Sequence, residues 1–78
     1  MKVKFSTFEK VNQFVDVITG FESDIDLVSG RYVVNAKSVM GVYSLDLSKE
    51  LELKIYERAD GDTEKLVQAL RDLNVIAE

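Results

Sequence analysis

Histidine, cysteine, proline and tryptophan are all absent from this chain of 78 residues. The absence of cysteine excludes a disulfide framework and thiolate chemistry. The absence of histidine removes the side chain that most often serves as a base or a nucleophile near neutral pH. Only four glycines are present, and they are dispersed, so the chain has no glycine-rich loop for binding phosphate.

Long hydrophobic runs and clustered positive charge are missing as well. No apolar run approaches the roughly 20 residues needed to span a bilayer. The first residues, Met1–Phe5, do not have the pattern of a signal peptide. The net charge is −4 and the basic residues are scattered, which disfavours binding to nucleic acid. We therefore expect a cytoplasmic protein that has neither a membrane nor a nucleic-acid partner.

Hydrophobic residues make up 46% of the chain and charged residues 31%, as is usual for globular proteins. The chain has no internal repeat and no linker, so we expect a single domain over residues 1–78. Alternating apolar residues predict strands at 2–6, 24–27, 31–35 and 51–56. Helical spacing predicts a helix that ends near Gly20, a short helix within 36–45 and a last helix at 63–74. The apolar positions of the first helix are Phe8, Val11, Phe14, Val15 and Ile18.

Two serines have the pattern of helix N-caps. Ser6, followed three residues later by Glu9, has the form of a capping box. Ser38 lies where the short helix is expected to begin. The predicted order βαββαβα, with strands that alternate, indicates an α+β open-faced sandwich. We expect a four-stranded, mainly antiparallel sheet with helices on one face. The other face should be open to water and carry Lys2, Lys4, Glu52 and Lys54.

The segment 37–45, with sequence KSVMGVYSL, resembles HPr, the small phosphocarrier of the sugar phosphotransferase system. The resemblance covers residues 11–78, and eight of the nine positions of this segment fit the family's pattern. It implies that Ser38 is the regulatory serine phosphorylated by a dedicated kinase. It also implies that Val39, Met40, Val42 and Tyr43 form a surface for a protein partner, either that serine kinase or a transcriptional regulator.

The loop before the first helix departs from the family. HPr carries Gly-Leu-His-Ala/Thr-Arg-Pro between its first strand and first helix, and the histidine carries the phosphoryl group. This chain has FSTFEK at 5–10 instead. A phosphate ester on Thr7 or Ser6 is stable and would trap the group rather than pass it on. Glu9 would repel a phosphate dianion near the helix N-terminus. Ser6, Thr7 and Glu9 thus form a degenerate phosphocarrier loop.

The favoured hypothesis is an HPr-like regulatory or binding module that acts through Ser38 and the short helix. We expect no enzymatic activity, no cofactor and no metal. Ser38 could instead be an ordinary N-cap, and about half of the apolar segment could belong to the core. The acidic residues at 60, 62 and 64 only vaguely suggest a calcium loop and fit a helix N-terminus better.

Three alternatives remain open. The domain could be a scaffold that binds an unrelated protein. It could be a small enzyme with a carboxylate-lined pocket around Glu9, Asp16 or Asp60. It could also carry a phosphoryl group on another residue.

Overall fold

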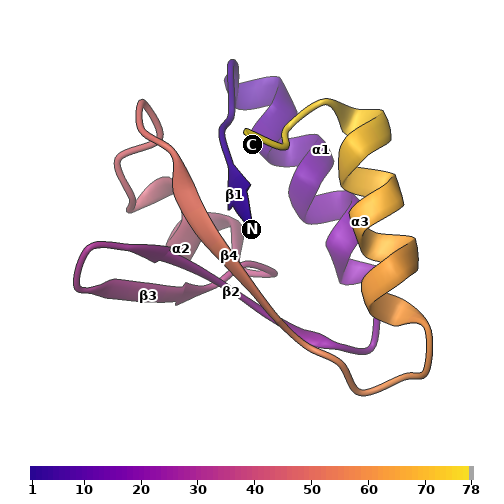
Figure 1. Cartoon of the computed structure of the whole chain (residues 1–78). Helices are drawn as coiled ribbons and strands as arrows, with labels where there is room; N and C mark the ends of the chain where they lie inside the picture. Colours follow the sequence, from indigo (N-terminus) through magenta and orange to yellow (C-terminus); the bar gives the residue numbers. More distant parts are fainter. Residues whose placement is uncertain (78) are drawn as a thin grey trace.

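The computed structural model describes residues 1–77. Its elements follow the predicted order βαββαβα: β1 (Lys2–Val3), α1 (Phe8–Thr19), β2 (Asp24–Ser29), β3 (Tyr32–Asn35), α2 (Val39–Tyr43), β4 (Leu51–Tyr56) and α3 (Asp62–Leu73). The strands form one sheet in the order β1-β4-β2-β3. Each neighbouring pair is antiparallel. Helices α1 and α3 run side by side against this sheet (Figure 1). The predicted α+β architecture is confirmed.

The core lies between one face of the sheet and the helices, because alternate strand residues point to that face. Leu27 of β2 pairs with Leu53 of β4 in the register, and both are buried. Helix α1 contributes its buried stripe Val11, Phe14, Val15 and Ile18, and α3 contributes Leu66 and Leu70. On the opposite face, Lys2, Lys4 and Lys54 are exposed and Glu52 is half-buried, as the alternation predicts.

The first strand is shorter than predicted. It ends at Val3, and the alternation of buried and exposed residues continues to Phe5, whose ring packs edge-on against Phe14 in the core at a centroid distance of 4.9 Å. The outer edge of β1 is covered by the end of the chain. The N–H of Lys4 donates to the carbonyl of Val75 at 2.8 Å, and the N–H of Ala77 donates to the carbonyl of Lys2 at 2.9 Å. Strand β1 therefore has backbone hydrogen-bond partners on both sides, β4 on one and residues 75–77 on the other.

A buried polar contact joins the start of β2 to the start of α3. Ser23 is fully buried, and its hydroxyl donates to the carboxylate of Asp62 at 2.7 Å. The same hydroxyl accepts the N–H of Arg58 at 3.0 Å, while the Arg58 guanidinium pairs with Asp24. Asp62 thus accepts two structural hydrogen bonds at Oδ2, from the N–H and the hydroxyl of Ser23. Within residues 1–77, no three His, Cys, Asp or Glu side chains gather closely enough to hold a metal.

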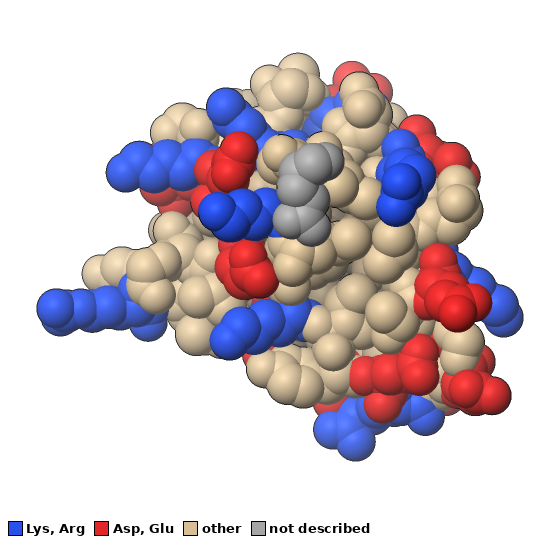
Figure 2. All heavy atoms as spheres, viewed as in Figure 1, with Lys and Arg blue, Asp and Glu red and all other residues tan. Residues whose placement is uncertain are grey.

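The face shown in Figure 2 carries charges of both signs with uncharged areas between them. None of the helices in the described part of the chain is both long and apolar enough to cross a membrane.

Candidate functional site

Helix α1 begins with a threonine cap. Thr7 has extended backbone angles, and its Oγ1 accepts the N–H of Lys10 at 3.1 Å. The capping box predicted for Ser6 and Glu9 is therefore wrong. The cap lies one residue later, so that position N3, where such a box needs Glu or Gln, is held by Lys10. Ser6, Thr7 and Glu9 are all exposed.

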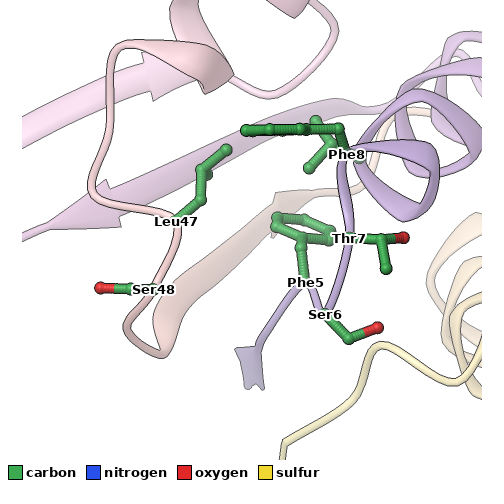
Figure 3. A pocket seen from close by; sticks show the side chains of 7 residues that line it. Phe5, Ser6, Thr7, Phe8, Leu47 and Ser48 are labelled. Atoms are coloured by element: carbon green, nitrogen blue, oxygen red, sulfur yellow. The ribbon is translucent and has the colours of Figure 1, made fainter.

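A pocket of about 430 Å³ lies beside this first turn. Its lining residues come from the loop before α1, the first turn of α1 and the loop before β4: Phe5, Ser6, Thr7, Phe8, Val11, Leu47 and Ser48. Leu47 points toward the rings of Phe5 and Phe8, whereas the hydroxyls of Ser6 and Thr7 point away from them (Figure 3). The wall is therefore mostly apolar. It suits an uncharged, apolar group, and it holds no cation to pair with a phosphate.

A short hydrogen-bonded turn positions Leu47 in this wall. The N–H and hydroxyl of Ser48 donate to Oδ1 of Asp46 at 3.1 and 2.6 Å. The Ser48 hydroxyl, then its N–H, and then the positive charge of Lys49 lower the pKa of Asp46 below its ordinary value. Ionised Asp46 thereby accepts both Ser48 hydrogen bonds and closes a short turn that contains Leu47.

Helix α2 begins at Ser38, as the sequence predicted. The side-chain Oγ accepts the N–H of Gly41 at 3.2 Å, and the backbone N–H of Ser38 donates to the carbonyl of Asn35 at 3.0 Å. Ser38 is exposed. The first turn of α2 contains no acidic residue. The neighbouring ammonium of Lys37 donates to the carbonyl of Phe21.

Helix α2 divides its apolar residues between the surface and the core. Met40 is 77% exposed, Val39 and Tyr43 are partly exposed, and Val42 is fully buried. The assignment of Val42 to the partner surface is therefore wrong. Val42 is the one residue of α2 that is buried, and it belongs to the core cluster. The hydroxyl of Tyr43 donates to Asn12 of α1 at 2.8 Å.

One residue of this surface was misplaced by sequence reasoning. Phe8 fits the apolar spacing of α1, yet it is 70% exposed. Its ring lies 5.7 Å from that of Tyr43. Phe8 is the first residue of α1 and falls one turn before the buried stripe begins. Its place ahead of the stripe, directly after the cap, was the available signal. We define the α1–α2 apolar surface as Phe8, Val39, Met40 and Tyr43.

The carboxylates proposed for an enzymatic pocket do not come together there. Glu9 and Asp16 are exposed on α1, and Asp60 is exposed in the turn before α3. None of the three lines the pocket. Glu9 instead accepts a hydrogen bond from Gln13 at 3.4 Å, within its own helix.

Fold and site together define a small open-faced α+β domain with an apolar surface and an exposed serine cap on neighbouring helices. Residues 10–74 match the family described as PTS HPr component phosphorylation site. The chain belongs to this HPr family of the phosphotransferase system.

Two solved structures are similar to this chain. HPr-C-His from Thermoanaerobacter tengcongensis is 34% identical, over 80% of this chain and 68% of that one, with a TM-score of 0.65. Crh, the catabolite repression containing protein of Bacillus subtilis, is 26% identical, over 100% of this chain and 90% of that one, with a TM-score of 0.68. That Crh structure is an intertwined dimer with a swapped domain.

Proposed function

We propose that this protein is a regulatory, cytoplasmic member of the HPr family that binds a protein partner through the α1–α2 apolar surface and is controlled by phosphorylation of Ser38. The observation that carries the proposal is the exposed Ser38 cap, two residues before the exposed Met40 on the same short helix. A phosphate there adds nearly two negative charges, next to a surface that is otherwise uncharged. Such a change alters which partner binds without altering the core.

We further propose that the domain is not a phosphocarrier, and the start of α1 supports this. Thr7 uses its hydroxyl oxygen as an acceptor within the helix. The pocket beside it is walled by Phe5, Phe8 and Leu47. Imidazole, which would form a transferable phosphoramidate, is absent from the whole sequence.

The first experiment is phosphorylation of the purified protein, followed by intact mass. The serine kinase of HPr with ATP is expected to add one phosphate, Ser38→Ala to abolish it, and Thr7→Ala, a matched cap variant, to keep it. Enzyme I with phosphoenolpyruvate is expected to add nothing. An unchanged mass with the serine kinase would contradict the regulatory role, and an acid-labile phosphate would contradict the loss of carrier function.

The second experiment tests the surface. The serine kinase of HPr is the partner to be immobilised, and binding is followed by surface plasmon resonance. Met40→Ala is expected to weaken binding about tenfold, since one large exposed contact is removed. Tyr56→Ala serves as control, because Tyr56 is 50% exposed on the opposite face of the sheet. Equal affinity for the two variants would exclude α2 as the docking element.

A further inference from the structure

The two edges of the sheet are protected differently. The outer edge of β1 is paired with residues 75–77 at the end of the chain. The outer edge of β3 has no strand beside it among residues 1–77, and the β2–β3 hairpin projects away from α1 and α3 (Figure 1). Proteins usually blunt such an edge by keeping the strand short, or with a charge, a proline or a bulge. β3 is short, with four residues, but its sequence YVVN contains no charge and no proline, and Tyr32 and Val33 are 72% and 60% exposed.

The hydrogen-bond alternation shows which backbone groups this edge offers. The N–H of Ala36, directly after β3, donates to the carbonyl of Ile25 in β2 at 2.9 Å. In an antiparallel ladder the backbone N–H and C=O groups of alternate residues point to the same neighbouring strand. Those of Val34 and Tyr32 therefore also point toward β2, whereas those of Val33 and Asn35 point outward. The Asn35 carbonyl already accepts the N–H of Ser38, which leaves Val33 as the residue whose donor and acceptor both point away from the sheet.

We propose that β3 pairs with β3 of a second copy of this chain, forming a homodimer with a continuous eight-stranded sheet. A two-fold axis perpendicular to the sheet keeps each face on its own side. Residues directly opposite each other must therefore belong to the same face. Val33 opposite the partner's Val33 meets this condition and lets the two residues exchange both backbone hydrogen bonds.

The side chains fit this register. On the open face, Val33 pairs with Val28 of β2 within one copy, so the dimer carries a continuous stripe of four valines across the axis. On the helix face, Tyr32 comes opposite the partner's Val34. Arg31 comes opposite the partner's Asn35, so no like charges are placed directly opposite each other. This self-complementarity favours a second copy over an extended peptide of another protein.

The test is sedimentation velocity of the full chain up to about 1 mM, a concentration at which weak, small interfaces associate. We expect a monomer–dimer equilibrium and slower hydrogen exchange at the Val33 amide as concentration rises. Val33→Lys puts two like charges opposite each other and is expected to weaken the dimer about tenfold. Tyr56→Lys, on the same face of the central strand β4, is expected to leave it unchanged. Because each copy carries −4, added salt should tighten the dimer.

Three results would overturn the proposal. The first is a monomer at every concentration. The second is a dimer that Val33→Lys and Tyr56→Lys affect equally, as expected for a swapped dimer that does not use β3. The third is weakening by salt, which indicates charge-driven association. The exchange measurement at Val33 needs no substitution, so it decides the matter even if Val33→Lys folds poorly.

Discussion

Helices α1 and α2 both begin at an exposed hydroxyl side chain that accepts a backbone N–H three residues on, yet their surroundings differ. Beside the Thr7 cap of α1 lies an apolar pocket, and Glu9 lies in the first turn. Beside the Ser38 cap of α2 lies a first turn without an acidic residue. The comparison shows that a hydroxyl cap is common to both helices. We therefore expect the neighbouring side chains, rather than the cap, to determine whether an added anion is tolerated.

The largest expected effect concerns the pocket beside α1. Phe5 is buried against Phe14, whereas Phe8 is mostly exposed. Phe5→Ala should lower the free energy of unfolding by about 3–4 kcal/mol, and Phe8→Ala should lower it by about 0.5 kcal/mol or less. Urea denaturation measures both. Phe5→Leu, at about 1 kcal/mol, provides a folded variant if Phe5→Ala exceeds the stability margin of this small domain. Similar losses for Phe5 and Phe8 would show that the pocket is more closed than in this structure.

The next effect lies within α2. Val42→Ala leaves a cavity under the helix and should cost about 2 kcal/mol, while Met40→Ala should change stability by no more than about 0.5 kcal/mol. Thermal denaturation followed by circular dichroism separates them. If Met40→Ala proved as costly as Val42→Ala, Met40 would belong to the core and the α1–α2 apolar surface would lose its most exposed member.

The division within α2 illustrates what sequence reasoning could and could not supply. The order of the elements along the chain, the buried stripe of α1 from Val11 onward and the Ser38 cap follow from local patterns, because alternation, helical spacing and capping depend on near neighbours in the chain. The burial of Val42 and the exposure of Phe8 depend on which parts of the chain pack against each helix in the tertiary fold. Periodicity over one or two turns does not carry that information.

The polar contacts between residues far apart in the sequence could not be predicted from the sequence either. Asp62 was recognised as an acidic residue at a helix start, but its bond to the buried Ser23 spans 39 positions. The pocket likewise joins 5–8 to Leu47 through the tertiary fold. The HPr resemblance located Ser38 and the short helix, and it marked the loop before α1 as altered. It did not indicate that this loop would form an apolar wall.

A smaller effect compares the two caps directly. Thr7→Ala and Ser38→Ala should each lower the free energy of unfolding by about 1 kcal/mol, since each leaves one backbone N–H of a first turn without its acceptor. Ser38→Asp should restore the loss, because aspartate caps well and its charge suits the N-terminus of a helix. Denaturation of the three variants checks this. A Ser38→Asp protein less stable than Ser38→Ala would show that the surroundings of α2 reject an anion, contrary to the comparison above.

The smallest effect concerns Asp46, whose turn holds Leu47 against the start of α1. Its pKa is lowered in the folded state, mainly by the Ser48 hydroxyl and then by the Ser48 N–H. The ionised carboxylate therefore adds stability above the pKa that Asp46 has in the unfolded chain, about 4, and this contribution is lost as the pH falls toward the folded-state value.

Ser48→Ala removes the hydroxyl, which is the larger cause of the lowered pKa, and keeps the N–H, so the pKa of Asp46 should rise part of the way back. NMR titration of the carboxyl carbon measures this. Ser44→Ala, whose hydroxyl donates to the carbonyl of Gly41 instead, should leave the titration unchanged. An identical midpoint in the wild-type and Ser48→Ala proteins would mean that the turn does not hold Asp46 in this way, and the position of Leu47 would then need another cause.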